Sequence, residues 1–203
     1  MNVALVDYGA GNLHSVHNAL KAVGANVEVT ADPAKVRAAD RIVLPGVGSF
    51  KACADGLRTL PGMAEALEQR VIAEGAPFLG ICVGMQLLAS RGLEHGETLG
   101  LGWIEGEVRL IEPNRPAIKI PHMGWNDVTT ASPHRVLSVG EAYFLHSYHF
   151  VPDDPAHVLA QTHHGDELVA AVAKENILGV QFHPEKSQKF GLELLEKFLE
   201  WKP

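Results

Sequence analysis

Apolar and polar residues follow two different periods along the first 90 residues, and these periods predict alternating strands and helices. Four short apolar runs are typical of buried strands: residues 2–7, 26–30, 40–44 and 77–81. Apolar residues at helical spacing predict helices over 13–23, between the candidate N-cap Asn12 and Gly24, and over 62–74. Strands that alternate with helices indicate an α/β fold, with an open, mostly parallel sheet flanked by helices.

The texture of the chain changes after residue 100. Short alternating or β-branched segments, separated by Pro and Gly, cover residues 103–111, 123–128, 141–145, 158–162, 168–173 and 177–182. This spacing predicts a meander of mostly antiparallel strands that extends the parallel sheet or packs beside it. Ser187 is expected to cap a last helix, whose apolar face consists of Phe190, Leu194, Leu195, Phe198 and Leu199.

The length and the net charge of the chain limit the number of domains and the kinds of partner that we expect. The chain has 203 residues without a repeat, linker or low-complexity segment, so we expect one domain over residues 1–203. Asp and Glu outnumber Lys and Arg by 24 to 17, a formal charge of −7, which argues against nucleic acid or an acidic membrane as a partner. No apolar run approaches the ~20 residues that span a bilayer, and no signal-peptide pattern follows Met1, so a cytoplasmic location is expected.

Cys82, one of two cysteines, is the first candidate catalytic residue. It lies in Gly80-Ile-Cys-Val-Gly84, a Gly-x-nucleophile-x-Gly pattern between a buried strand and a helix-compatible run at 85–89. Such a turn places the sulfur at a helix N-terminus, where free N–H groups favour the thiolate. The alternative is that Cys82 is a small buried residue in a glycine-tolerant turn. Cys53 has no such pattern and is expected to be structural.

A candidate base and a group that orients it occur in His183-Pro-Glu185, directly after the predicted strand at 177–182. Residues two apart in an extended segment point to the same side, so the Glu185 carboxylate can hold one tautomer of the His183 imidazole. Taken alone, this tripeptide would also suit an ordinary loop.

A glycine-rich segment, Leu44-Pro-Gly-Val-Gly-Ser-Phe50, follows the third predicted strand, at the edge where open α/β sheets bind ligands. Its glycines can expose backbone N–H groups to an oxyanion, alongside the N–H of Val83, although the segment could equally be a structural turn. Tyr8-Gly-Ala-Gly-Asn12 lacks the third glycine of a dinucleotide fingerprint, so no nucleotide is expected there.

Histidines and tryptophans raise two further questions. His146, His149, His163 and His164 could suggest a metal site, but adjacent histidines on a strand face opposite ways and no Cys/His cluster has zinc spacing. We therefore expect neither a metal nor another cofactor. Trp103 and Trp201 are expected to pack in the core or at its edge, whereas an exposed Trp125 would suit an interface.

Three segments, Pro45-Gly-Val-Gly48, Gly80-Ile-Cys-Val-Gly-Met-Gln86 and His183-Pro-Glu185, resemble the class I (triad) glutamine amidotransferases, and the similarity covers nearly the whole chain. The resemblance implies a flavodoxin-like class I glutaminase fold. It also implies that Cys82 attacks the side-chain amide of glutamine, that His183 shuttles the proton and that Glu185 orients His183, so that glutamate and ammonia form through a thioester. The implied oxyanion donors are the N–H groups of Val47 and Val83, and the implied substrate contacts are Gly46, Gly48, Gln86, Ser147 and Tyr148.

Residues 7–16, 121–126 and 143–148 are similar to those family members that supply ammonia for histidine biosynthesis. The implied partner is a (β/α)8 cyclase subunit in a heterodimer, which uses the ammonia to make imidazole glycerol phosphate and an aminoimidazole carboxamide ribotide. The residues implied near the interface and ammonia exit are Asn12, Trp125, Tyr143 and Lys186. We also hypothesise that the isolated subunit is nearly inactive, because residues 45–48 present a carbonyl to the oxyanion until docking shifts them.

Two other interpretations stay open at this point. Another Cys-His-Glu glutaminase or a γ-glutamyl hydrolase would act without a cyclase. A non-catalytic regulatory module of the same fold would keep its function without Cys82.

Overall fold

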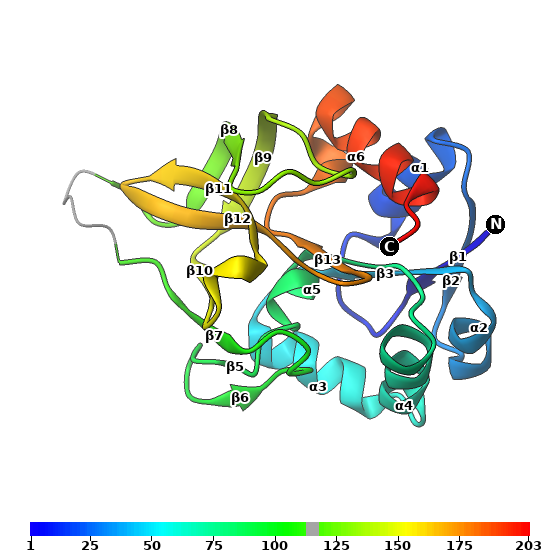
Figure 1. Cartoon of the computed structure of the whole chain (residues 1–203). Coiled ribbons are helices and arrows are strands. Elements are labelled where there is room, and N and C mark those ends of the chain that lie inside the picture. Colours follow the sequence, from blue (N-terminus) through cyan, green and yellow to red (C-terminus); the bar gives the residue numbers. More distant parts are fainter. Residues whose placement is uncertain (113–117) are drawn as a thin grey trace.

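The computed structural model describes residues 1–112 and 118–203, and the strands of this part of the chain form two sheets (Figure 1). The larger sheet has the strand order β2-β1-β3-β4-β13-β12-β11-β8-β9. Its members are β1 (Asn2–Val6), β2 (Asn26–Thr30), β3 (Arg41–Gly46), β4 (Phe78–Cys82), β8 (His122–Thr130), β9 (Gly140–His146), β11 (Val158–His164), β12 (Asp166–Lys174) and β13 (Ile177–Val180). The smaller sheet has the order β10-β7-β5-β6 and consists of β5 (Arg91–Gly92), β6 (Thr98–Leu99), β7 (Gly106–Leu110) and β10 (Tyr148–Pro152).

The parallel half of the large sheet is built from the short apolar runs of the sequence, and it brings three strand ends together. β1 pairs in parallel with β2 and β3, and β4 pairs in parallel with β3 and β13. β3, β4 and β13 are buried along their whole lengths, as continuous apolar runs require. The register pairs Gly46 with Cys82, so the ends of β3 and β4 carry two of the predicted motifs at one edge of the sheet.

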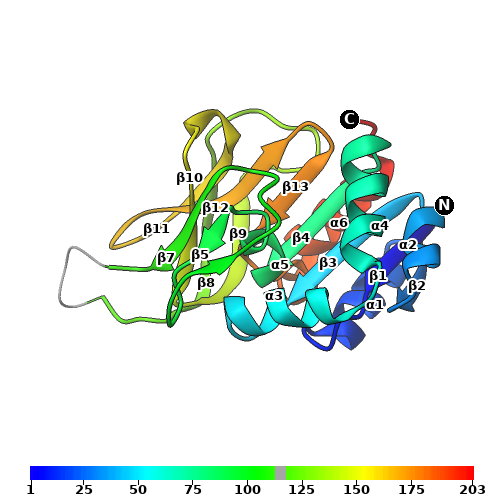
Figure 2. The ribbon, with the colours of Figure 1, turned by 90° about the horizontal axis from the view of Figure 1, so that it is seen from below.

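Helices cover both faces of the parallel half. The helices are α1 (Leu13–Ala22), α2 (Pro33–Ala38), α3 (Phe50–Thr59), α4 (Met63–Leu67), α5 (Val83–Gln86) and α6 (Gln188–Glu200), with the π-helix η1 (Glu68–Ala73) and the 3-10 turns η2 (Pro155–His157) and η3 (Pro184–Lys186). α1 and α6 lie together on one face, and α2, α3 and α4 lie on the other (Figure 1). Figure 2 shows the second group from below, in front of β1, β3 and β4. The expected α/β architecture is therefore confirmed.

The predicted antiparallel segments both extend the large sheet and form a second sheet beside it. β12, β11, β8 and β9 extend the large sheet with antiparallel pairs beyond β13. β7 and β10 pair with each other in the small sheet, which lies beside that antiparallel half (Figures 1 and 2). The segment after β9 can therefore leave the large sheet and enter the small one within two residues, between His146 and Tyr148.

The structure differs from the sequence predictions at several short elements. α2, α3, β5, β6 and β10 were not predicted, because elements of two to ten residues carry few periodic positions. The helix predicted over 62–74 exists, but its second half is the π-helix η1, which a pattern of only six residues cannot distinguish from an α-helix. The predicted caps Asn12 and Ser187 occupy the N-cap positions of α1 and α6, yet neither side chain makes a capping hydrogen bond.

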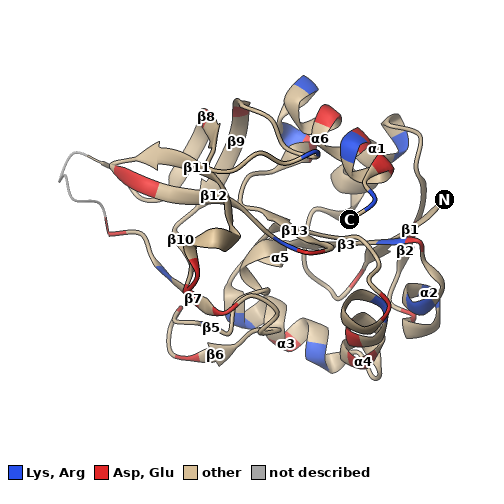
Figure 3. Ribbon diagram, viewed as in Figure 1, with Lys and Arg blue, Asp and Glu red and all other residues tan. Residues whose placement is uncertain are grey.

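The core lies between the sheets and the helices. Phe50, Phe78, Phe144, Phe150, Phe182 and Phe198 are all fully buried there. Trp103 and Trp201 are buried as expected, whereas the Trp125 side chain is 47% exposed. Basic and acidic residues are interspersed over the helices and loops in the view of Figure 3, with neither sign gathered in one place. Among the described residues, no helix has the length and apolar character needed to cross a membrane.

Candidate active site

Cys82 lies on a sharp turn at the end of β4, and two glycines make this turn possible. Its backbone has φ 55° and ψ −113°, a conformation that a residue with a side chain rarely adopts. A Cβ atom on Gly84 would lie 1.9 Å from the carbonyl oxygen of Leu44, and one on Gly80 would lie 2.5 Å from that of Gly84. The close backbone approach expected from the Gly-x-Cys-x-Gly pattern is thus present. The helix that follows, α5, is shorter than the predicted run and ends at Gln86.

The structure brings His183 and Glu185 to Cys82. Nδ1 of His183 lies 2.9 Å from Oε1 of Glu185, and the His183 ring also interacts with the side chain of Cys82. The Glu185 side chain has no exposed area, and the His183 side chain is 3% exposed. Glu185 lies in the 3-10 turn η3, so the extended backbone assumed from the sequence is wrong, although the two side chains do meet. The second carboxylate oxygen, Oε2, is buried without a hydrogen-bond partner among the described residues.

These neighbours set the charge of His183. Burial is the largest influence and lowers the pKa, but hydrogen bonds to Cys82 and Glu185, and the negative charges of both, outweigh it and raise the pKa to about 9. His183 is therefore protonated at neutral pH, with Nδ1–H donated to Glu185 and the other N–H directed at the sulfur. A protonated imidazole beside the sulfur is the kind of partner that activates a nucleophilic cysteine.

The raised pKa of His183 predicts a stability that falls at alkaline pH. A folded-state pKa above the unfolded value adds stability that is complete below the unfolded pKa of 6.5 and is lost as the pH rises through about 9. Urea unfolding at pH 6 and pH 9.5 is expected to show a loss of about 3 kcal/mol from this residue. The His183→Gln variant should lack this part of the decline, and an equal decline in both proteins would contradict the assignment.

Ser187 and Gly191 hold the His183-Pro-Glu185 turn in place. The Ser187 hydroxyl donates to the carbonyl oxygen of His183 (2.6 Å) and accepts from the backbone N–H of Tyr143 (3.0 Å), which explains why it does not cap α6. Helix α6 approaches the turn so closely that a Cβ on Gly191 would lie 1.9 Å from the carbonyl oxygen of Pro184. Both contacts fix the backbone on which His183 and Glu185 stand.

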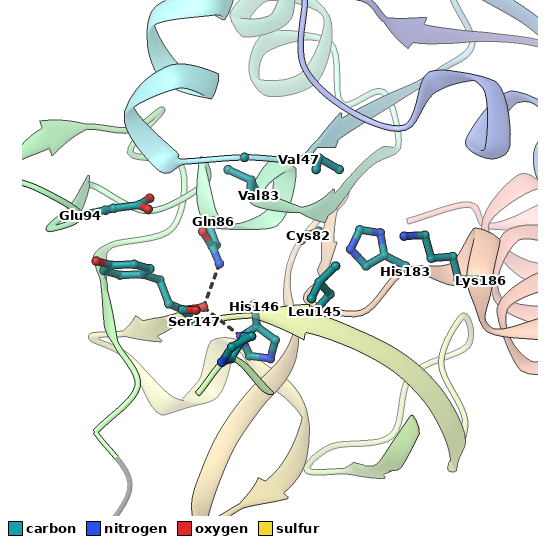
Figure 4. Close-up of a pocket in the computed structure, with 13 residues that line it drawn as sticks. Val47, Cys82, Val83, Gln86, Glu94, Leu145, His146, Ser147, His183 and Lys186 are labelled. Atoms are coloured by element: carbon teal, nitrogen blue, oxygen red, sulfur yellow. Dashed lines mark hydrogen bonds between the residues drawn. The ribbon is translucent and has the colours of Figure 1, made fainter. Parts of the chain in front are cut away.

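A cavity of about 350 Å³ opens beside Cys82 and His183 (Figure 4). It is lined by Val47, Gly48, Cys82, Val83, Gln86, Glu94, Pro121, Leu145, His146, Ser147, Tyr148, His183 and Lys186. Nine of the predicted site residues are in this set. The other five predicted residues do not line the cavity: Gly46, Glu185, Asn12, Trp125 and Tyr143. In Figure 4, Val47 and Val83 lie on one side of Cys82 and Leu145 lies on the other.

Gln86 presents one kind of atom to the cavity. Its Nε2 group donates to the carbonyl oxygen of Tyr148 and to Oε1 of Gln181, both at 3.0 Å. Because both amide hydrogens are used, the remaining polar atom is Oε1, a hydrogen-bond acceptor. A ligand in the cavity would therefore meet Gln86 as an acceptor.

Glu94, Pro121, Leu145 and His146 also line the cavity, and the sequence reasoning did not identify them as site residues. Oε2 of Glu94 accepts the backbone N–H of Phe50 at 2.7 Å, which ties its loop to the first turn of α3. Nothing in the local sequence marks Glu94, because it reaches the site from a loop 44 residues further along the chain. Glu94 adds a carboxylate to a cavity that is otherwise mostly apolar.

The glycine-rich segment is held by two buried side chains. Tyr8 donates its hydroxyl hydrogen to the carbonyl oxygen of Pro45, and Cys53 donates its thiol hydrogen to that of Val47 at 3.7 Å. Burial raises the pKa of Tyr8 above its usual value and that of Cys53 to about 11, so both groups stay protonated donors. Cys53 is structural, as expected, and it fixes the segment that follows β3.

This difference between the thiols predicts selective labelling. At pH 7.5 a thiol with a pKa of about 11 is ionised only to about one part in 10³ or less, and Cys53 has no exposed area. Cys82 faces an open cavity and contacts a protonated histidine. Brief treatment with iodoacetamide is therefore expected to modify Cys82 alone, as read by peptide mass spectrometry. Equal labelling of Cys53 would contradict this picture.

Three of the four residues expected near an interface form a continuous row, which begins at Lys186 in the cavity wall. Nζ of Lys186 lies 5.7 Å from the centre of the Tyr143 ring, and the Tyr143 and Trp125 rings meet edge to face with centroids 6.2 Å apart. Met123 and Leu145, on the same pair of strands, are exposed apolar residues. Asn12 is half-buried at the N-cap position of α1, a helix that contacts the turn η3, which contains Lys186.

Several of the histidines contact one another. The rings of His122 and His164 stack with centroids 4.2 Å apart, and Nδ1 of His122 lies 2.9 Å from Nε2 of His146. His163 faces the other way and pairs with Glu167. Within residues 1–112 and 118–203, no group of three or more His, Cys, Asp or Glu side chains is arranged to hold a metal ion.

Comparison with known proteins gives a consistent result. The model of the family "Glutamine amidotransferase class-I" matches residues 4–201. The chain is 58% identical to the imidazole glycerol phosphate synthase subunit HisH of Zymomonas mobilis, over 99% of this chain and 96% of that protein. It is 50% identical to the subunit of the same name from Rhodospirillum rubrum, over the full length of both chains.

Solved structures show the same fold at much lower identity. A crystal structure of a glutamine amidotransferase matches with a TM-score of 0.76 and 22% identity, over 97% of each chain. A glutamine amidotransferase from Thermotoga maritima matches with a TM-score of 0.67 and 14% identity, over 98% of this chain and 96% of that one. At these identities the likeness concerns the fold alone.

Proposed function

The chain belongs to the class I glutamine amidotransferase family, and from this membership we propose that it is the glutaminase subunit of an imidazole glycerol phosphate synthase, which serves histidine biosynthesis. The observation that carries the activity is the arrangement of Cys82, His183 and Glu185, with His183 between the sulfur and the carboxylate. Two relatives that match over nearly their whole lengths support the choice of pathway. We propose that residues 1–203 act as one glutaminase domain.

The proposed reaction passes through a thioester on Cys82. The thiolate attacks the side-chain amide carbon of glutamine, and the C–N bond breaks as His183 gives a proton to the leaving nitrogen, which departs as ammonia. Water then attacks the thioester carbon and gives a proton to His183, and the C–S bond breaks to release glutamate and the thiolate. Glu185 holds Nδ1–H of His183, so that the other ring nitrogen always faces the reacting atoms.

We assign the oxyanion and substrate contacts from the wall of the cavity. The N–H groups of Val83 and Val47 are the proposed oxyanion donors, since both residues line the cavity beside Cys82. Oε1 of Gln86 and the carboxylate of Glu94 are acceptors that suit the α-ammonium group of glutamine. The other proposed substrate contacts are Gly46, Gly48, Ser147 and Tyr148.

We propose that the second subunit is a (β/α)8 cyclase that forms a heterodimer with this chain over the Lys186–Tyr143–Trp125 row, with Asn12 at its border. The exposed apolar residues Met123 and Leu145 next to this row support an interface there. Ammonia is mostly protonated at neutral pH and then unreactive, so a closed path from the cavity to the cyclase would preserve its reactivity. The two free cysteines suit a reducing compartment, so we propose a cytoplasmic location.

The test measures glutamate release by the purified chain, alone and with a candidate cyclase and its nucleotide ligand. We expect stimulation by about 10- to 100-fold, and no release from the Cys82→Ala variant under either condition. Equal rates with and without the cyclase would support a glutaminase but contradict the assignment of a cyclase partner. Hydrolysis of γ-glutamyl peptides without any partner would support a γ-glutamyl hydrolase, and a cellular function unchanged by Cys82→Ala would support a regulatory module.

A further inference from the structure

Gln181 contacts the sulfur of the candidate nucleophile Cys82, although it belongs to none of the motifs found in the sequence. It directly follows β13, its residue has no exposed area, and its backbone N–H donates to the carbonyl of Ala170. Nε2 of its side chain lies 3.7 Å from Sγ of Cys82, a hydrogen-bond distance for sulfur, and Oε1 accepts from Nε2 of Gln86. The only groups that the described structure places against this sulfur in hydrogen bonds are thus Gln181 and His183.

The direction of each hydrogen bond follows from one backbone carbonyl. The oxygen of Tyr148 can only accept, so Gln86 must turn its NH2 group toward it (Figure 4). The same NH2 group then donates to Gln181, which must meet it with oxygen. This leaves the NH2 group of Gln181 toward Cys82, so the sulfur receives a donor and not an acceptor.

A second chain of bonds holds the same carbonyl from the other side. Nδ1 of His146 lies 2.9 Å from the Tyr148 oxygen and therefore carries the hydrogen (Figure 4). Its Nε2 must then accept from Nδ1 of His122, whose own Nε2 accepts from the side-chain amide of Asn126 at 3.0 Å. Burial lowers the pKa of His146 to about 3 and that of His122 to about 4, so both rings stay neutral and keep these roles.

We propose that Gln181 is a further catalytic residue, whose Nε2–H stabilises the Cys82 thiolate and whose orientation is dictated by the Gln86–Tyr148 chain. This inference rests on the proposed role of Cys82 as nucleophile. A neutral N–H donor stabilises a negative sulfur and, unlike a second cation, does not compete for the proton that His183 handles. The bond weakens when the sulfur is acylated and returns when the thiolate leaves the thioester, so it assists the release of glutamate.

The test replaces Gln181 with methionine, which has a similar volume and no donor. A hydrogen bond to a charged group contributes a factor of about 10 to 100, so the alkylation of Cys82 by iodoacetamide at pH 7.5 should slow by that factor in Gln181→Met. We expect kcat for glutamine hydrolysis in the assembled enzyme to fall by a similar factor with little change in KM. The matched control is Gln161→Met on β11, which should alter neither rate.

A second variant, Gln181→Asn, keeps the amide but withdraws it from the sulfur, and it should show the same slowing of alkylation and the same fall in kcat if Gln181→Met does not fold. Alkylation rates within twofold of the unmodified chain in a folded variant would overturn the proposal. So would a rise in KM without a fall in kcat, because that would indicate altered access of the substrate. Failure of the proposed function would be seen in a different experiment, as glutamate release by the Cys82→Ala variant.

Discussion

Replacement of Cys82 by alanine or glycine is expected to abolish glutamine hydrolysis, and the glycine variant is expected to be the more stable of the two. Loss of the nucleophile removes the thioester route, which corresponds to a fall in kcat of about 10⁴-fold or more. The backbone at this position has φ 55°, which strains any residue with a Cβ but not glycine. The cost of such a conformation is about 1 to 3 kcal/mol, so Cys82→Gly should exceed Cys82→Ala in free energy of unfolding by about 1 kcal/mol.

Two measurements check this result. Glutamate release in the presence of the second subunit gives kcat, and urea unfolding of the two variants gives the difference in stability. Comparison of glycine with alanine removes the effect of the thiol itself, since both lack it. An alanine variant that is as stable as the glycine variant would mean that the turn is not strained, and residual hydrolysis within about 100-fold of the unmodified enzyme would exclude Cys82 as nucleophile.

The second large effect is expected from Glu185→Gln. The amide has the shape of the carboxylate but no charge, so it weakens both the orientation of His183 and the raised pKa that keeps the ring protonated. A loss of about 10²- to 10⁴-fold in kcat is expected, by analogy with other triads whose orienting carboxylate becomes an amide. The fold should survive, because one carboxylate oxygen already lacks a hydrogen-bond partner in the described structure.

The measurement for Glu185→Gln is kcat together with a histidine NMR titration, in which the pKa of His183 should fall from about 9 toward its ordinary value. The matched control is Glu196→Gln, an exposed carboxylate on α6, which should change neither quantity. A variant with near-normal kcat and an unchanged His183 titration would show that Glu185 has no role in orienting the ring.

The parallel half of the fold can be predicted well from the sequence because strands buried on both faces consist of short continuous apolar runs. β2 is predicted at its observed bounds, and β1, β3 and β4 within one or two residues at each end. The antiparallel half is predicted in kind but not in pairing, since nothing in β7 or β10 indicates that they leave the large sheet for a second one. Short elements such as α2, and the change from α- to π-helix at Glu68, lie below what periodicity can resolve.

The candidate triad can be found from sequence because each part is marked locally, by glycines around Cys82 and by proline between His183 and Glu185. Glu94, His146 and Gln181 have no such marks, because Glu94 and His146 reach the cavity, and Gln181 reaches Cys82, through contacts between distant segments. Gln181 and Cys82, for example, are 99 residues apart. One signal was available: Gln181 is a polar residue in the otherwise apolar run at 177–182, two positions before His183.

Gly191 of α6 links the stability of the helix to the position of the catalytic residues. Alanine is favoured over glycine inside a helix by about 1 kcal/mol, so position 191 of α6 is one that a search for heat-resistant variants would exchange first. Here the added methyl group would press on the Pro184 carbonyl and shift the residues on either side of it, His183 and Glu185. The packing of an outer helix against the Pro184 carbonyl thus determines the positions of His183 and Glu185.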